Sequence, residues 1–169
     1  MKIIDSFLFH NEFDMLKLRL EYLRDFVDYF VISECNYTFS GKEKPYYLDQ
    51  VIDKFDDDLK SKIISVRYEP DVSEYDFSKT TECNFESGFW KVESGQRQHT
   101  LSASSKFDDK DIFMLSDLDE IPNSLFIEEL KNNSERFLPK DRAATLMFDN
   151  LYYNFFTYEN SDWPGTVIC

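Results

Sequence analysis

The chain is 169 residues long, and 42% of its residues are hydrophobic and 17% aromatic. This length suits one domain with a sizeable buried core, and the composition excludes intrinsic disorder. The net charge of −14 disfavours nucleic acid and anionic membranes as partners, because both bind basic surfaces. An anionic nucleotide would also be repelled, unless a divalent cation or a local cluster of Arg and Lys offsets the charge.

Cysteine and histidine usage sets further limits. Cys35, Cys83 and Cys169 are far apart in the sequence, which indicates reduced thiols rather than a disulfide framework or a metal site. His10 and His99 are too few for a histidine-based site, and we expect each to be a polar surface or hydrogen-bonding residue. No apolar stretch approaches the roughly 18 residues of a membrane span, and the N-terminus lacks a signal-peptide pattern. A soluble, cytoplasmic protein is therefore expected.

The first third of the chain predicts a strand–helix–strand unit. Residues 3–9 form a mostly apolar first strand that two polar residues interrupt. Asn11 is expected to be the N-cap of a helix that has Asp14 at its third position. This helix carries one apolar stripe, made of Leu16, Leu20, Leu23 and Val27. A second buried strand covers 29–32, and crossovers of this kind are almost always right-handed.

The middle of the chain alternates loops with regular elements. We predict a polar, aromatic loop at 36–47, a short acidic helix at 51–59 and a third strand at 62–66. Residues 69–89 carry acids among aromatic side chains with little periodicity, which indicates a functional or mobile loop or, equally, a solvated connection. Residues 90–104 have the pattern of a helix, although Gly95 lies inside it.

The segment Asp111–Pro122 organises the chain. Its continuous apolar run at 112–115 predicts a strand buried on both faces, as in a parallel sheet. Asp117, Asp119 and Glu120 follow at the carboxyl end of this strand, where ligands bind in open α/β sheets. If the chain stays extended, Asp117 and Asp119 point to the same side, and their hard oxygen donors suit Mg²⁺ or Mn²⁺. The alternative is a solvated acidic turn that closes a buried strand.

The last third completes the pattern of alternating strands and helices. We predict a helix at 124–137, an apolar strand at 143–148 and the start of a further strand at 163–169. The chain shows no internal repeat, no low-complexity tract and no linker. The expected fold class is α/β, with a mostly parallel central sheet flanked by helices in a single domain at 1–169.

Several segments resemble known glycosyltransferases. Asp117-Leu118-Asp119 resembles the Asp-x-Asp signature of glycosyltransferases of the GT-A fold, which is Rossmann-like. A longer series of segments resembles glycosyltransferase family 17 and follows the same order along nearly the whole chain. These segments are 5–14, 30–34, 38–42, 96–97, 115–122, 152–154 and 163–165.

The resemblance implies a metal-dependent, inverting reaction. A sugar, first of all N-acetylglucosamine, would move from a UDP-sugar donor to a hydroxyl group of a glycan acceptor. A Mn²⁺ or Mg²⁺ ion bridging the diphosphate would stabilise the charge of the leaving group. Asp119 would be a direct metal ligand, and Asp117 would contact the ribose or reach the metal through water. Glu120 would support this site or form an outward salt bridge.

The resemblance also suggests residues that contact the nucleotide. Asn11, Glu12 and Glu34 follow the first two strands, where relatives of this fold hold uridine and ribose; each is also explained as a capping or turn residue. Arg97 is expected to face the diphosphate, because its planar fork suits phosphate oxygens, or else to be a surface charge. Gln98 stands where the family pattern leads us to expect Asn.

An inverting transfer needs a carboxylate base that deprotonates the acceptor hydroxyl. Asp149 is the best candidate, since it ends an apolar strand, with Glu159 and Asp162 behind it. Family members continue past the element at 163–165 into acceptor-side structure. We therefore expect this chain to be truncated at its C-terminal side relative to a working enzyme. It would bind the nucleotide with metal but hydrolyse the donor slowly and transfer little.

Two other functions fit parts of the pattern. One is a metal-dependent phosphohydrolase, although its usual paired aspartates lie near the first strand and precede Thr or Val, not Glu-Ile-Pro. The other is a non-catalytic or truncated domain that only binds nucleotide sugars. Release of phosphate from a phosphomonoester would favour the former, and binding without turnover the latter.

Overall fold

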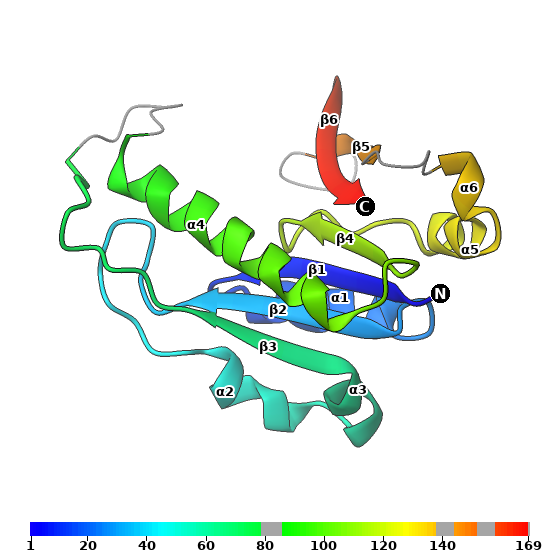
Figure 1. Ribbon diagram of the computed structural model, residues 1–169, viewed down its shortest axis with the longest axis horizontal. Coiled ribbons are helices and arrows are strands. Elements are labelled where there is room, and N and C mark those ends of the chain that lie inside the picture. The colour runs from blue at the N-terminus through cyan, green and yellow to red at the C-terminus, as the bar shows by residue number, and fades with distance from the viewer. Residues whose placement is uncertain (79–85, 138–143, 152–157, 169) are drawn as a thin grey trace.

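The computed structural model describes residues 1–78, 86–137, 144–151 and 158–168, with 144–151 and 158–166 described by their backbone alone. Its centre is a six-stranded sheet with the order β3-β2-β1-β4-β6-β5 (Figure 1). The strands are β1 (Ile3–Phe9), β2 (Tyr29–Cys35), β3 (Ile63–Tyr68), β4 (Ile112–Ser116), β5 (Ala144–Leu151) and β6 (Tyr158–Ile168).

Most of the sheet is parallel. β1 pairs in parallel with β2 and with β4, and β2 pairs in parallel with β3. β6 runs antiparallel to both β4 and β5. The predicted α/β class with a mostly parallel, Rossmann-like sheet is therefore confirmed. Because β1, β2, β3 and β4 run in the same direction, their carboxyl ends meet at one edge of the sheet.

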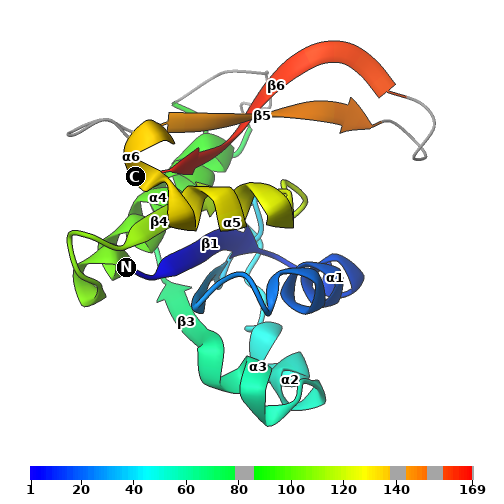
Figure 2. The same ribbon diagram turned by 90° about the vertical axis from the view of Figure 1, so that its right-hand side faces the viewer.

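Helices cover both faces of the sheet (Figures 1 and 2). They are α1 (Phe13–Leu23), α2 (Leu48–Val51), η1 (Ile52–Lys54), α3 (Asp57–Lys62), α4 (Gly88–Ser102), η2 (Ala103–Lys106), α5 (Ser124–Asn132) and α6 (Ser134–Phe137). α1, α2, α3 and α5 pack on one face over the larger apolar core. On the other face, Ala103 of η2 packs with Ile4 and Val31 in a smaller cluster. In the part of the chain that the structure describes, no helix has the length and apolar character needed to cross a membrane.

The start of α1 differs from the prediction. Asn11 is not the N-cap; that position belongs to Glu12, whose side chain makes no capping bond. The longer Glu12 side chain instead turns back, and its carboxylate accepts the backbone N–H groups of His10 (3.2 Å) and Asn11 (3.0 Å). The predicted apolar stripe is confirmed for its three leucines, which are fully buried, whereas Val27 is buried beyond the end of the helix at Leu23.

Two of the predicted helices are divided into shorter helices. In the segment 51–59, Asp56 has extended backbone and accepts the N–H of Leu59 at 3.0 Å, so that a separate helix begins after it. In the segment 124–137, Asn133 leaves the helical region and separates α5 from α6. The Asp56 side chain competes with helix hydrogen bonds in this way, which apolar periodicity alone does not reveal.

Gly95 lies inside α4 without breaking it. The helix predicted at 90–104 is present as α4 and η2, and Ser87 caps its start by accepting the N–H of Trp90 at 3.4 Å. A Cβ atom at Gly95 would overlap the hydroxyl of Tyr68 on β3. The glycine therefore lets α4 lie close against the edge of the sheet.

Candidate functional site

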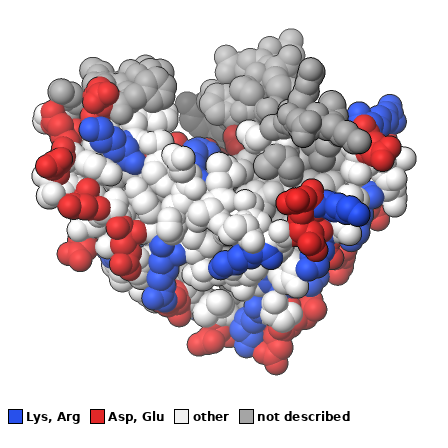
Figure 3. All heavy atoms as spheres, in the orientation of Figure 1, with Lys and Arg blue, Asp and Glu red and all other residues white. Residues whose placement is uncertain are grey.

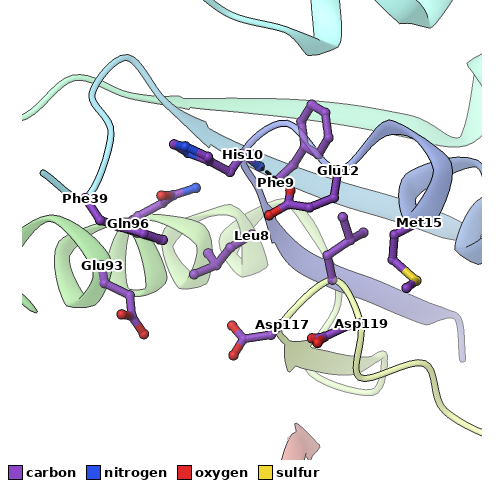
Figure 4. Close-up of a pocket in the computed structure, with 11 residues that line it drawn as sticks. Leu8, Phe9, His10, Glu12, Met15, Phe39, Glu93, Gln96, Asp117 and Asp119 are labelled. Atoms are coloured by element: carbon purple, nitrogen blue, oxygen red, sulfur yellow. Dashed lines mark hydrogen bonds between the residues drawn. The ribbon is translucent and has the colours of Figure 1, made fainter. Parts of the chain in front are cut away.

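A cavity of about 400 Å³ opens at the carboxyl ends of β1 and β4 (Figure 4). The two strands are in register there, with Phe7 opposite Ser116. This is the position at which open α/β sheets bind their ligands. The wall is formed by Leu8, Phe9, His10, Glu12, Met15, Phe39, Glu93, Gln96, Asp117, Leu118 and Asp119.

The turn after β4, called here the acidic turn (residues 117–120), supplies two carboxylates to the cavity. β4 ends at Ser116, and the Glu120 N–H then donates to the Asp117 carbonyl at 3.2 Å. The extended conformation that would place Asp117 and Asp119 on one side of a strand is thus absent. Both side chains nevertheless line the same cavity, and Figure 4 shows both on the turn that follows β4. Asp119 is exposed, and Asp117 is half-buried.

Glu120 supports the acidic turn from within. Its carboxylate accepts the backbone N–H of Asp117 at 3.0 Å. Of the two roles that the sequence left open, support of the turn agrees with this contact, because it fixes the first peptide of the Asp-x-Asp segment.

Arg97 on α4 lies beside the acidic turn. Its Nη2 donates to Asp117 Oδ1 at 2.6 Å and to Glu93 Oε1 at 3.1 Å. Burial disfavours the charged guanidinium, but attraction to Asp117 and Glu93 outweighs this effect and raises the pKa of Arg97. The structure therefore joins two residues that the sequence analysis assigned to one site. Asp117 is part of the cavity wall, and its partner Arg97 is not.

The residues expected at the ends of β1 and β2 are in different environments. Glu12 and Asn11 are both exposed, but only Glu12 is part of the cavity wall. Glu34 is fully buried under the loop that follows β2. Its carboxylate accepts Lys44 Nζ at 2.7 Å and the backbone N–H groups of Tyr47 (2.7 Å) and Leu48 (3.0 Å). In this structure Glu34 holds the loop in place, as a turn residue would.

The Glu34–Lys44 pair leads to a stability prediction. Lys44→Met keeps the buried stem but removes the cation, so the free energy of unfolding should fall by about 2 kcal/mol, since two backbone donors still hold the carboxylate. Urea unfolding followed by circular dichroism measures this change. Lys42→Met on the same loop is the matched control, because Lys42 is exposed and its replacement should change stability by about 0.5 kcal/mol or less. Equal losses in the two variants would contradict a structural role for the pair.

Sequence reasoning missed the aromatic side of the cavity. His10 stacks on Phe39 with ring centroids 5.5 Å apart and planes 9° from parallel, and Phe39 packs on Phe89 at 5.1 Å. Burial and the nearby Lys44 lower the pKa of His10, which favours the neutral ring. His10 is therefore a half-buried part of the cavity wall, where we expected a polar surface or hydrogen-bonding residue. A usable signal was its position directly after the first strand.

Two further wall residues come from one face of α4. Glu93 and Gln96 are three positions apart, a spacing that places side chains on the same face of a helix. Gln96 is buried, and its Nε2 donates to the Ser33 carbonyl of β2 at 2.8 Å. This bond ties α4 to the sheet edge beside the cavity. The sequence shows that Glu93, Gln96 and Arg97 lie close together on one predicted helix. It does not show which face of that helix points into the cavity.

The predicted base lies on the β5–β6 pair, where the structure describes the backbone alone. Asp149 is in β5, opposite Asp162 of β6. Only Val167 and Ile168 of β6 pair with β4, so the rest of this strand continues past the carboxyl end of β4. β5 runs in the same direction as β4, and Asp149 is close to its carboxyl end. The backbone register thus puts Asp149 toward the same end of the sheet as the acidic turn.

The carboxylates of the cavity suit one kind of metal site. Among the described residues, no three His, Cys, Asp or Glu side chains are grouped closely enough to form a complete metal cage. Mg²⁺ and similar hard cations are commonly held by one or two carboxylates, with substrate phosphates and water as the other ligands. Asp117 and Asp119 fit this second arrangement. They do not fit a structural metal site that the protein fills alone.

Comparison with known proteins identifies the family of the chain. The family model described as glycosyltransferase family 17 matches residues 1–169. Comparison with curated proteins and with solved structures found no match. The chain belongs to glycosyltransferase family 17.

Proposed function

We propose that this glycosyltransferase moves N-acetylglucosamine from a UDP-sugar to a hydroxyl group of a glycan acceptor, with inversion at the anomeric carbon. The observation that carries the proposal is the cavity at the carboxyl ends of β1 and β4, where Asp117 and Asp119 meet with Arg97 behind them. The diphosphate and the cation are inferred from these charges. The sugar and the acceptor class are inferred from the family.

A divalent cation, Mn²⁺ or Mg²⁺, would be held directly by Asp119, with Asp117 reaching it through water or binding the ribose. When bound, such a cation stabilises the negative charge that builds on the departing diphosphate. Arg97 adds a positive charge that is partly shielded from solvent, 34% of its side chain being exposed. On the face shown in Figure 3, acidic and basic side chains are interspersed over the described surface. In this proposal, charge compensation for the nucleotide comes from the cation and from Arg97 beside Asp117.

The opposite wall of the cavity suits the nucleoside. His10 and Phe39 present stacked rings, and apolar and aromatic walls with a few polar groups are typical of small-molecule sites. Glu12 adds a carboxylate that accepts hydrogen bonds, as the hydroxyl groups of a ribose require. The nucleoside would thus lie toward the end of β1 and the diphosphate toward the acidic turn.

The transfer step needs one proton acceptor. In the proposed reaction, the acceptor hydroxyl oxygen forms a bond to the anomeric carbon while the bond from that carbon to the diphosphate oxygen breaks. The hydroxyl proton passes to the Asp149 carboxylate, and UDP leaves with the electron pair of the broken bond. Attack from the face opposite the diphosphate inverts the anomeric carbon.

Nucleotide binding by the unmodified chain tests the proposal. Isothermal titration calorimetry with UDP-N-acetylglucosamine should give tighter binding with Mn²⁺ than with a chelator. Binding to the folded state should also raise the free energy of unfolding, by about 2.7 kcal/mol at a ligand concentration of a hundred times the Kd. GDP- and CDP-sugars should compete poorly against the uridine ligand.

Each part of the proposal has an opposing outcome. Equal affinity with metal and with chelator would contradict the cation. Better competition by guanosine or cytidine diphosphate sugars would contradict the donor. Release of phosphate from a simple phosphomonoester would point to a phosphohydrolase, and binding with no turnover of the donor would point to a binding domain.

A further inference from the structure

Arg19 of α1 is a fully buried arginine that uses all of its hydrogen-bond donors. A guanidinium has five N–H groups, and each of them has an acceptor here. Nε and Nη2 donate to the two Asp5 carboxylate oxygens at 2.9 and 2.7 Å, and Nη2 also donates to Ser116 Oγ at 2.7 Å. Nη1 donates to the carbonyl groups of Asp117 (2.7 Å) and Leu118 (3.0 Å).

These contacts tie three parts of the molecule to one point. Asp5 belongs to β1, Ser116 ends β4, and the two carbonyl groups belong to the acidic turn. The Phe7 ring lies under the guanidinium at 4.5 Å and completes its environment. The Asp5 carboxylate balances the positive charge of Arg19. Both side chains are 0% exposed, so solvent does not screen this pair.

Stability alone does not account for a charged pair at this place. Replacing a buried ion pair by apolar side chains of similar volume is often neutral or stabilising, because ion pairs lose much hydration energy on burial. What apolar side chains cannot do is donate to the inward-facing carbonyl groups of the turn. Because peptide groups are planar, holding the carbonyl groups of Asp117 and Leu118 fixes the two peptide planes that flank Leu118. The backbone positions from which the Asp117 and Asp119 side chains start are thereby fixed.

We propose that Arg19 is a positioning residue that holds the acidic turn in the geometry required for cation-dependent binding of the nucleotide. The inference rests on the proposed function of Asp117 and Asp119. Arg19 acts from the sheet side of the turn, through its carbonyl groups, while Glu120 holds the N–H of Asp117. Two charged side chains that are not part of the cavity wall thus hold the turn, Glu120 at a backbone N–H group and Arg19 at two carbonyl groups.

The test compares Arg19→Lys with a control of reduced stability on the same helix. Lys keeps the charge but has three donors on a single nitrogen in place of a planar fork. The measured quantity is the ratio of the UDP dissociation constants with chelator and with Mn²⁺, determined by calorimetry at a temperature where circular dichroism shows each variant folded. Because both constants come from one variant, a loss of folded protein cancels in the ratio. Support of a metal ligand by its neighbours is typically worth 10–100-fold, so we expect the ratio to fall by at least about tenfold in Arg19→Lys.

Leu23→Ala is the matched control. Leu23 is fully buried in α1, so its truncation should lower stability, but Leu23 makes none of the hydrogen bonds that hold the turn. Its ratio should equal that of the unmodified chain. An unchanged ratio in Arg19→Lys, or an equal fall in Leu23→Ala, would overturn the proposal. A ratio of one in the unmodified chain would mean that Mn²⁺ does not strengthen UDP binding, and it would contradict the proposed function itself.

Ser116→Ala covers the case in which Arg19→Lys does not fold. It removes one acceptor of Arg19 next to the turn and leaves the Asp5 pair intact. The ratio should then fall by about threefold, as expected for the loss of one hydrogen bond. An unchanged ratio in Ser116→Ala, with Arg19→Lys unfolded, would also overturn the proposal.

Discussion

Asp119→Asn is expected to abolish the Mn²⁺ enhancement of UDP-sugar binding and to lower turnover of the donor by about 10²–10³-fold, as when other enzymes lose a group that stabilises transition-state charge. The amide keeps the shape of the side chain but removes the negative charge that would hold the cation. Asp119 is exposed at the mouth of the cavity, so the fold should not change. Calorimetry with and without Mn²⁺, and release of UDP over time, measure the two effects.

The matched control is Asp109→Asn. Asp109 is an exposed aspartate in the turn that precedes β4, at the opposite end of the same strand. Its replacement changes the net charge by the same amount and should leave both binding and turnover as they are. If the two variants behaved alike, the metal would be responding to the overall acidity of the protein and not to the acidic turn.

Asp149→Asn is expected to lower turnover of the donor by about 10²–10⁴-fold, the usual contribution of a general base, while UDP-sugar affinity stays unchanged. The reason is that a base acts on the attacking hydroxyl and not on the nucleotide. Transfer to a glycan acceptor and hydrolysis of the donor by water should both fall, since each nucleophile must lose a proton. Mass spectrometry of the products and calorimetry of the donor measure rate and affinity separately.

Asp162→Asn is the control for this experiment, because Asp162 is opposite Asp149 on the neighbouring strand. The two replacements make the same chemical change on the same hairpin. A large loss of turnover in Asp162→Asn, with Asp149→Asn fully active, would assign the base to the other strand. A loss of donor affinity in Asp149→Asn would show that this residue belongs to the donor site.

Some of the site could be predicted from the sequence because its signals are local. A strand buried on both faces requires a continuous apolar run. The run at 112–115 predicted such a strand, and it forms β4. Ligands in α/β sheets bind beyond the carboxyl ends of strands, which pointed to Asp117 and Asp119 before their contacts were known. The strong net negative charge required a nearby cation, and Arg97 is paired with Asp117.

Other roles depended on which elements pack together. In the sequence, Glu34 follows an apolar run just as Asp117 does. Its three donors, however, come from the loop and the helix start at residues 44–48, whose path is not encoded by periodicity. The same is true of His10, whose stacking partner Phe39 comes from the loop after β2. Side chains that look equivalent along the chain are thus separated by contacts between distant residues.

Arg19 shows both what the sequence determines and what only the tertiary structure determines. In the sequence it falls on the buried stripe of α1, three positions after Leu16 and four before Leu23, and Asp5 interrupts an apolar strand. A charge on a buried face requires a partner, so the sequence by itself determined that both residues needed one. That they pair with each other, and that the guanidinium also holds the acidic turn, was decided only by the tertiary structure. The physical reason is that α1 packs across β1 and β4, which brings residues 14 and 98 positions apart within hydrogen-bonding distance.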